Sequence, residues 1–302
     1  MTHYIFAYDL ENPEACVRAA PVLARLHEQH EIPATFFLLG RVLEQTGAEL
    51  KPILDSPLFD LQSHTYAHQM LRDNRMHGPG VPLEEVRREI TLGKRWVEDT
   101  FERPCTGTRS GCGFFRGMRG QKERLAIIAE AGMRYLSTDL RGPADSIPSG
   151  LQQAYAYADD GFPDLLELPG HGWHDNVLKA PQQFRLCLSW PPVLTWGIPN
   201  RPVRTPEEEM AVQRVWIDRA AMLRLPFLSL VYHPHSIHRQ SEECRIVELL
   251  MRYVKAMGLR PTTYTALAES YAANPETLPS PDIWRWEDQV AQGRLEVGLG
   301  RG

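Results

Sequence analysis

Short apolar runs alternate with amphipathic runs along most of this 302-residue chain, and this alternation limits the fold more than any single motif. Residues 34–39 form a nearly continuous apolar run that ends at Gly40, which is typical of a strand buried on both faces of a parallel sheet. Residues 15–30 and 82–97 carry apolar side chains three and four positions apart, which predicts helices. Strands that alternate with helices form a parallel sheet covered by helices, either open or closed into a barrel.

The remaining elements follow the same pattern. Further strands are expected at residues 4–8, 57–61, 133–138, 165–168 and 227–232, further helices at 122–131, 205–223 and 242–257, and a last strand and helix over 262–271. Residues 176–204 hold five prolines and are expected to be irregular. We therefore predict one α/β domain over residues 1–273. Residues 274–302, with Trp284 and Trp286 among charged residues, are expected to wrap this domain or to pack against a second subunit of a homo-oligomer.

The composition is that of a globular enzyme, with 43% hydrophobic and 24% charged residues. The net charge of -5 comes from interleaved acids and bases, so neither nucleic acid nor an anionic membrane is expected as a partner. The five cysteines form no Cys-x-x-Cys pair, which favours a reducing compartment. The chain has no apolar run long enough to span a bilayer and no secretory leader pattern, so a cytoplasmic location is expected.

Polar and ionisable residues recur where the expected strands end. They are Asp9, Glu11, His64, His68, Arg109, Asp139, His171, His174 and His233. The carboxyl ends of parallel strands gather at one face of an α/β fold, where active sites are built. Asp9 and Glu11 are two positions apart, so in an extended backbone their side chains point the same way. A constellation drawn from several strands is hard to explain as solvated surface.

His64 and His68 have the spacing of two metal ligands. If the backbone turns helical at His64, the two imidazoles lie one turn apart on the same face and can converge on one ion. The alternative is a pair of surface histidines, because a His-x-x-x-His spacing arises easily in a chain with 11 histidines. Together with Asp9 and Glu11, the pair would supply three ligands and one base, with a coordination position left for water.

The motifs resemble those of the polysaccharide deacetylase family, carbohydrate esterase family 4. The resemblance is carried by Tyr8-Asp9-Leu10-Glu11, residues 32–40, His64-Thr65-Tyr66-Ala67-His68 and the late strand that ends in His233, and it spans about residues 3–270. The family contains chitin and peptidoglycan N-deacetylases with related amidases and deformylases. The resemblance implies a distorted β/α barrel of about seven parallel strands.

The resemblance also implies a role for each strand-end residue. Asp9 would be the general base, Glu11, His64 and His68 the ligands of one divalent, zinc-like ion, Arg109 the residue that orients Asp9, His233 the general acid, and Asp139 the carboxylate that tunes His233. The family's first motif has two adjacent aspartates, whereas this chain has Asp9-Leu10-Glu11. The sequence therefore leaves open which carboxylate holds the metal.

The expected activity is metal-dependent hydrolysis of a linear amide, most simply N-deacetylation of an N-acylated sugar or a related small substrate. The family's Arg-x-Pro element appears here as Arg109-Ser110-Gly111-Cys112, and the segment at Asp139 lacks the family's tryptophan, so a polymeric glycan is disfavoured. His171, Trp173 and His174 are expected to line the substrate pocket. Two alternatives stay open: an allantoinase-like or formamide amidase on the same scaffold, and a carbohydrate-binding relative without catalysis.

Overall fold

The computed structural model describes residues 1–180 and 198–291, and strands and helices alternate through both ranges. The first half contains β1 (His3–Ile5), β2 (Ala7–Leu10), α1 (Pro13–His30), β3 (Ala34–Leu38), α2 (Gly40–Leu54), β4 (Phe59–Ser63), α3 (Leu83–Phe101), β5 (Gly107–Phe114), α4 (Lys122–Glu130) and β6 (Tyr135–Asp139). The second half contains β7 (Tyr155–Tyr157), β8 (Phe162–Glu167), α5 (Asp175–Lys179), α7 (Pro206–Met222), β9 (Phe227–Leu228), β10 (Val231–Tyr232), α8 (Pro234–Gln240), α9 (Arg245–Ala256), β11 (Arg260–Thr262), α10 (Tyr264–Ala273) and α11 (Trp286–Ala291). Much of the segment expected to be irregular and the last residues of the chain lie outside the described residues.

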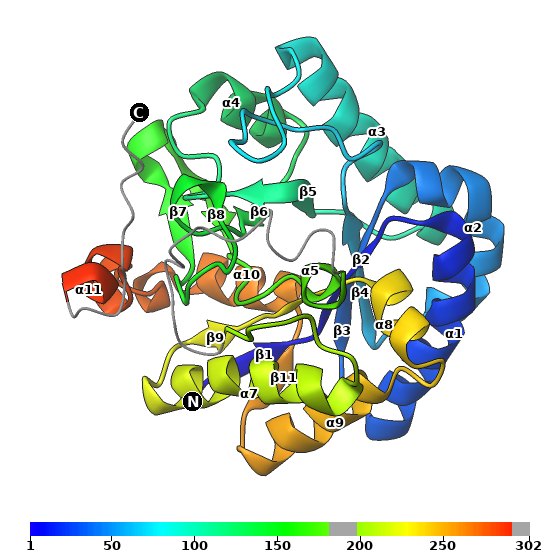
Figure 1. The fold of residues 1–302 in the computed structure, drawn as a ribbon. Coiled ribbons are helices and arrows are strands. Elements are labelled where there is room, and N and C mark those ends of the chain that lie inside the picture. The colour runs from blue at the N-terminus through cyan, green and yellow to red at the C-terminus, as the bar shows by residue number, and fades with distance from the viewer. Residues whose placement is uncertain (181–197, 292–302) are drawn as a thin grey trace.

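The strands form one large sheet and one small sheet. The large sheet has the order β10-β2-β3-β4-β5-β6-β8-β7, and all of its pairs are parallel except β7 with β8. The small sheet has the order β11-β1-β9 and is parallel throughout. Figure 1 shows α1, α2 and α3 following one another around the outside of the strands. The expected α/β fold with a mostly parallel sheet is confirmed.

Two strands expected to be continuous are broken in the middle. Residues 4–8 divide at Phe6 into β1 and β2, and residues 227–232 divide after Leu228 into β9 and β10. The breaks lie side by side, because β1 pairs with β9 in the small sheet and β2 pairs with β10 in the large one. Both strands therefore bend together as the sheet curls. The apolar pattern runs unbroken through both bends and could not reveal them.

Side chains alternate between two hydrophobic clusters along the strands. On β2 and β3, Tyr8 and Phe36 belong to the large outer cluster beneath the helices, whereas Ala7 and Phe37 belong to a smaller inner cluster. The inner cluster also holds Tyr264, the first residue of α10. Because the side-chain period of a strand is two, Asp9 and Glu11 follow Ala7 on the inner side. The sequence thus directs two carboxylates into the ring of strands.

The gap between β8 and β10 is bridged just beyond the end of β8. His171 forms an isolated parallel bridge with Leu230, and its backbone N–H donates to Ser229 O at 2.7 Å. This contact links the segment that follows β8 to the residue that precedes β10, without a continuous ladder. The architecture is that of a curled parallel sheet close to a distorted β/α barrel, as expected.

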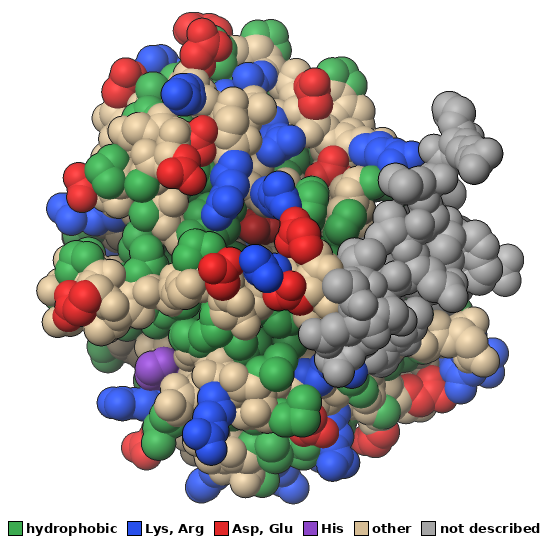
Figure 2. Space-filling view, turned by 90° about the vertical axis from the view of Figure 1, so that its left-hand side faces the viewer, with side chains coloured by type: hydrophobic (Ala, Val, Ile, Leu, Met, Phe, Trp, Pro, Cys, Tyr) green, Lys and Arg blue, Asp and Glu red, His purple; other side chains and the backbone are tan. Residues whose placement is uncertain are grey.

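The segment from Asn274 onward packs against the barrel as far as it is described. Trp284 and Trp286 are buried and lie edge to face with ring centroids 5.1 Å apart. On the face in Figure 2, basic and acidic side chains are interspersed. None of the helices in residues 1–180 and 198–291 is long and apolar enough to cross a membrane.

Candidate active site

Two carboxylates leave the end of β2 on the inner side of the strands. Asp9 is the third residue of β2 and is 3% exposed, and Glu11 directly follows the strand. The outward neighbour Leu10 packs in the core, and Asn12 caps α1 by accepting a hydrogen bond from Ala15 N at 2.9 Å. Strand and helix therefore fix the backbone on both sides of Glu11.

His64 is placed at the end of β4 by a backbone contact with the neighbouring strand. Its Nδ1–H donates to Arg109 O at 3.0 Å, so Nε2 carries the free lone pair of the ring. Such a backbone bond on the remote ring nitrogen is the usual way in which a ligand histidine is oriented. The side chain is buried at the floor of the site.

His68 reaches the site on a loop, and the expected helical turn between His64 and His68 is wrong. Thr65 and His68 both have a left-handed backbone, with φ of 65° and 61°. The loop is held by Glu89 of α3, whose Oε2 accepts hydrogen bonds from Ala67 N at 2.8 Å and Gln69 N at 3.3 Å. The two imidazoles still converge, with centroids 5.1 Å apart, but through loop geometry that the spacing alone does not specify.

Glu11 lies at the meeting point of three imidazoles. Its Oε1 is 3.1 Å from His64 Nε2, 3.0 Å from His68 Nε2 and 3.5 Å from His233 Nε2. Two groups of potential ligand atoms lie within 4.8 Å of one another: Glu11 with His64 and His68, and Asp9 with Glu11 and His233. Two imidazole nitrogens and a carboxylate oxygen are a donor set that suits zinc or a similar divalent ion. The residues present therefore fit such an ion.

Arg109 holds Asp9 from inside the barrel. Its Nη1 donates to Asp9 Oδ1 at 2.8 Å, and Nη2 donates to Ser137 Oγ at 3.1 Å and to Tyr264 OH at 2.8 Å. The guanidinium also lies 4.2 Å from the ring centroid of Phe37. The contact between Arg109 and Asp9 expected from the sequence is therefore present. Removal of either partner would leave an uncompensated buried charge.

The carboxylate beside His233 is Asp175, not Asp139. His233 follows β10, and its Nδ1 lies 2.5 Å from Asp175 Oδ1, while its backbone N–H donates to Asp175 Oδ2 at 3.1 Å. Asp175 begins α5 and also lies 3.4 Å from the buried Lys179. The expected pairing of Asp139 with His233 is thus replaced. The sequence signal that could have identified Asp175 is an acid at the start of a short helix, just after the histidine-rich segment.

Asp139 belongs to a separate buried cluster at the end of β6. Its Oδ1 accepts hydrogen bonds from Arg116 N and Gln152 Nε2, both at 3.1 Å. Burial, reinforced by the nearby charge of Glu167, raises the pKa of Asp139 to about 8. Glu167 was not anticipated, although it ends the strand next to β6. Asp139 therefore belongs to this buried cluster and is not among the residues that line the cavity beside the imidazoles.

Only one of the three residues expected to line the substrate pocket does so. His171 is fully buried: its Nδ1 accepts a hydrogen bond from Ser229 N at 3.0 Å, and its Nε2 lies 2.7 Å from Gln152 O. Trp173 is fully buried in the outer core. His174 lines the cavity beside the carboxylates. His171 and Trp173 are thus part of the barrel wall. All three residues follow the same expected strand, and this position alone did not distinguish His174 from the other two.

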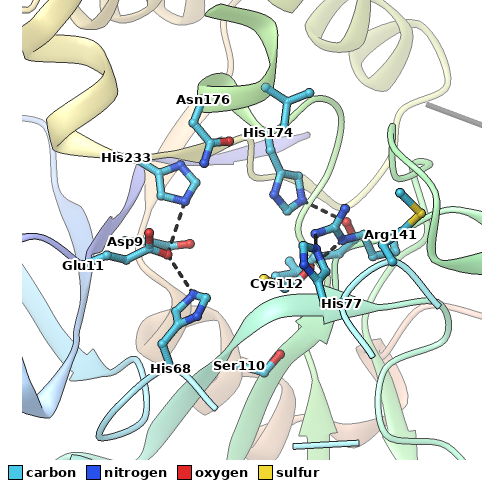
Figure 3. A pocket seen from close by; sticks show the side chains of 13 residues that line it. Asp9, Glu11, His68, His77, Ser110, Cys112, Arg141, His174, Asn176 and His233 are labelled. Carbon is cyan, nitrogen blue, oxygen red and sulfur yellow. Dashed lines mark hydrogen bonds and ion pairs between the residues drawn. The ribbon is translucent and has the colours of Figure 1, made fainter. Parts of the chain in front are cut away.

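A cavity of about 350 Å³ opens beside the carboxylates and imidazoles. Figure 3 shows Asp9, Glu11, His68 and His233 on one side and His174, Arg141, His77 and Cys112 on the other. Asn176 projects between them, and its buried Oδ1 accepts no hydrogen bond from any residue that the structure describes. Asn176, Arg141 and His77 were not anticipated from the sequence.

The charges of Glu11 and His233 shift each other's pKa. Burial alone would raise the pKa of Glu11, but the positive charge of His233, together with the close contacts of Glu11 with the imidazoles around it, holds that pKa well below its usual value. Burial alone would lower the pKa of His233, but the negative charges of Glu11 and Asp175 hold it well above its usual value. In the protein without an ion, Glu11 is therefore ionised and His233 is protonated.

Comparison with known proteins is consistent with this geometry. Residues 7–136 match the family model described as polysaccharide deacetylase. A search of curated proteins finds no match to the sequence. Several solved structures are similar in fold. One is a putative polysaccharide deacetylase from Mycobacterium smegmatis, with a TM-score of 0.64 and 19% identity over 92% of this chain and 93% of that one.

Two further structures extend the comparison. The Puue allantoinase has a TM-score of 0.63 and 11% identity, over 90% of each chain. The BA3943 protein of Bacillus anthracis, described as a carbohydrate esterase family 4 pseudoenzyme, has a TM-score of 0.54 and 14% identity over 89% of this chain and 66% of that one. At these identities the likeness concerns the fold. The activity must be argued from the side chains.

Proposed function

Because residues 7–136 match the polysaccharide deacetylase family, we propose that the protein is a metal-dependent hydrolase of linear amides that removes an acyl group from an N-acylated sugar or a related small substrate. The observation that carries this proposal is the convergence of His64 Nε2, His68 Nε2 and a Glu11 oxygen within 4.8 Å. His233, which can donate a proton, and Asp9, a second carboxylate, lie beside the same cluster.

The contacts favour Glu11 as the acidic ligand and Asp9 as the base. Glu11 Oε1 is within 3.1 Å of both ligand histidines, whereas Asp9 is held by Arg109 at 2.8 Å. The bond to Arg109 fixes the orientation of the Asp9 carboxylate beside the ligand cluster. This assignment gives the two acids of Asp9-Leu10-Glu11 different tasks.

Each side chain of the site would have a separate role in the reaction. A divalent ion, zinc by the chemistry of its ligands, would supply Lewis-acid polarisation of the amide carbonyl. Asp9 would accept the proton of the attacking water. His233 would donate a proton from Nε2 to the departing amine, with Asp175 holding Nδ1 in the orientation required. Asn176 Oδ1 would accept the N–H of the scissile amide.

The size of the cavity supports a small substrate. About 350 Å³ is at the lower end of the range for small-molecule sites. No phenyl, phenol or indole ring lines it in the described part of the chain, so a stacking platform for a long glycan is missing from these residues. A formamide or ureide of similar size is therefore the second candidate substrate class.

Metal analysis with one ligand replaced tests the proposal. The purified protein should hold about one equivalent of a divalent ion and release acid or amine from small N-acyl compounds. His64→Ala should lower metal affinity at least about tenfold and abolish turnover. Chelation should abolish turnover of the wild type, and added zinc should restore it. The exposed His30, in the last turn of α1, provides the matched control His30→Ala, which should change neither property.

Two results would contradict the proposal in different ways. A protein that binds no divalent ion with all three ligands intact would exclude the metal site. A protein that binds the ion, releases nothing from acyl, formyl or ureide compounds, and still binds glycans after His64→Ala would be a non-catalytic relative.

A further inference from the structure

Ser110 brings a buried hydroxyl group to the wall of the cavity. The residue is fully buried, yet its side chain lines the cavity. Its Oγ has no hydrogen-bond partner among the residues that the structure describes. An unpaired buried hydroxyl costs free energy, so such groups are normally hydrogen-bonded in folded proteins. An unpaired hydroxyl at a cavity wall is therefore available to the molecule that the cavity binds.

The irregular end of β5 places this hydroxyl at the cavity. β5 pairs regularly with β6 as far as Arg109, and the pairing resumes only at Phe114. An irregularity of this kind changes the direction of side chains and is common next to active sites. Arg109 holds Asp9, and the next residue, Ser110, lines the same cavity. One strand thus fixes the hydroxyl at a constant place relative to Asp9.

Ser110 lies on the side of the cavity away from the proton donor. Figure 3 shows Ser110 on the side of His68, whereas His233 and Asn176 lie on the opposite side. The backbone agrees with this placement, because a Cβ at the next residue, Gly111, would lie 2.8 Å from His68 Nδ1. Two polar atoms without a partner in the described part of the chain, Ser110 Oγ and Asn176 Oδ1, therefore lie on opposite sides of the cavity.

The proposed reaction assigns these two sides to different parts of the substrate. The departing amine must face His233, which would donate a proton to it, and Asn176 Oδ1 would accept its N–H. The substituent of the acyl group is bonded to the other side of the carbonyl carbon. This substituent would therefore point away from His233 and toward Ser110.

We propose that Ser110 selects an acyl group that carries a hydroxyl next to the carbonyl, as in an N-glycolyl compound, over a plain acetyl group. This inference rests on the proposed hydrolase function and narrows its substrate class. The methyl of an acetyl group would displace water from Ser110 Oγ without replacing its hydrogen bond, which lowers affinity. A hydroxyl in its place can donate to Oγ or accept from it. A site that hydrogen-bonds a substrate group discriminates against the analogue that lacks this group.

Two compounds that share one amine and differ in the acyl group test the inference. N-acetylglucosamine and N-glycolylglucosamine differ by one hydroxyl, and their rates of alkaline hydrolysis give the intrinsic difference in reactivity. Beyond this intrinsic ratio, we expect the wild type to prefer the glycolyl compound by about tenfold or more in kcat/KM, the range for one buried hydrogen bond. Ser110→Ala should bring the ratio of the two kcat/KM values down to the intrinsic ratio, mainly through KM.

Two further variants show whether the hydroxyl at position 110 is responsible. Ser110→Thr keeps the hydroxyl, so it should retain part of the preference. Ser229→Ala removes another fully buried hydroxyl that has no partner among the described residues, but Ser229 does not line the cavity, so the preference should stay unchanged. The ratio of the wild type is measured without any variant, so a misfolded Ser110→Ala would not suspend the test.

Calorimetric binding of both compounds to the same protein separates this inference from the hydrolase function. Tighter binding of the glycolyl compound that is lost in Ser110→Ala, in a protein without turnover, would support the role of Ser110 and contradict the hydrolase. Turnover at the intrinsic ratio would support the hydrolase and overturn the role of Ser110. A preference that persists in Ser110→Ala would also overturn it. A protein with neither turnover nor a difference in binding would contradict both.

Discussion

At the scale of single residues, the geometry of the site also depends on residues that have no reactive or metal-ligating side chain. Gly111 lies two residues beyond Arg109 on β5, against the imidazole of His68. A Cβ at position 111 would lie 2.8 Å from His68 Nδ1 and 2.9 Å from its Cγ and Cε1. These distances are shorter than contacts that real Cβ atoms make, so the ring would have to move. Glycine at this position therefore lets the loop histidine reach Glu11.

Gly111→Ala is expected to damage the proposed metal site and to spare the fold. The backbone of Gly111 is outside the left-handed region, so alanine brings no backbone strain, and the displaced His68 ring should lower metal affinity about tenfold or more. Metal titration and thermal unfolding measure the two effects separately. Gly47→Ala is the control, because its Cβ would make ordinary contact with Thr100 at 3.4 Å, and it should keep full affinity. Unchanged metal binding in Gly111→Ala would show that His68 is not a ligand.

The residues that sequence reasoning could find are those fixed by a strand. Asp9, Glu11, Arg109 and His233 lie in a strand or directly at its end, and the period of two sets the side they face. Sequence reasoning did not identify Asp175, because this residue contacts His233 from a short helix that is 58 positions away in sequence. A contact between two segments of this kind depends on how both pack, and neither local pattern contains that information.

At the scale of elements, the prediction succeeded where one apolar pattern matched one element. The run at residues 34–39 became β3, which is buried throughout. The helix expected over residues 205–223 became α7, and the Thr205 side chain caps it by accepting a hydrogen bond from Glu208 N at 3.2 Å. The bends at Phe6 and after Leu228 were missed. They are imposed by the curl of the whole sheet, since each bend occurs where the partner strand also changes sheet.

The segment after α10 tests the expected domain boundary at residue 273. Trp284 packs so closely on Gly150 that a Cβ there would lie 2.0 Å from the indole, and Glu287 pairs with Arg116 at 2.6 Å. Trp284→Ala should lower the free energy of unfolding by about 2 kcal/mol, below the full cost of a buried tryptophan because the segment can detach locally. Urea unfolding and limited proteolysis after residue 273 measure this.

The neighbouring Ile283 supplies the control for that change. It is 42% exposed, so Ile283→Ala should alter stability by less than about 0.5 kcal/mol. Equal effects of the two substitutions would mean that the segment is a loosely attached extension. A clear difference would mean that residues 274–291 are part of the folded domain, and that its boundary lies further along the chain than the sequence indicated.

At the scale of the whole molecule, two buried histidines far apart in sequence hold the barrel together in their neutral form. His27 of α1 donates from Nδ1 to Ile32 O at 2.8 Å and accepts from Tyr8 OH at 2.8 Å, which ties helix to strand. His171 bridges Gln152 and Ser229 across the gap between β8 and β10. Burial lowers the pKa of each to about 4. Protonation of either ring would place a donor where an acceptor is needed.

The stability of the fold should therefore depend on pH in a way that can be assigned to His27. Above the unfolded pKa of 6.5 neither state binds the proton, and the contacts of His27 contribute in full. As pH falls below 6.5 the unfolded chain binds a proton at His27, whereas the folded chain does not bind it until about pH 4. The contribution of His27 to the free energy of unfolding therefore falls by about 1.4 kcal/mol per pH unit in this range. The destabilisation caused by His27→Gln should thus be largest at pH 7.5 and about 2 kcal/mol smaller at pH 5.

Urea unfolding of the wild type and the variant across this range measures that difference, because other titrating groups, including Asp139, act equally on both proteins. His30→Gln, on the exposed side of the same helix, should show no such trend. A His27→Gln penalty that stays constant from pH 7.5 to pH 5 would mean that the imidazole takes up its proton in the folded protein as readily as in the unfolded chain. The bond from Tyr8 OH to Nε2 would then have to run in the opposite direction, and the junction of helix and strand would be held by a charge rather than by a neutral ring.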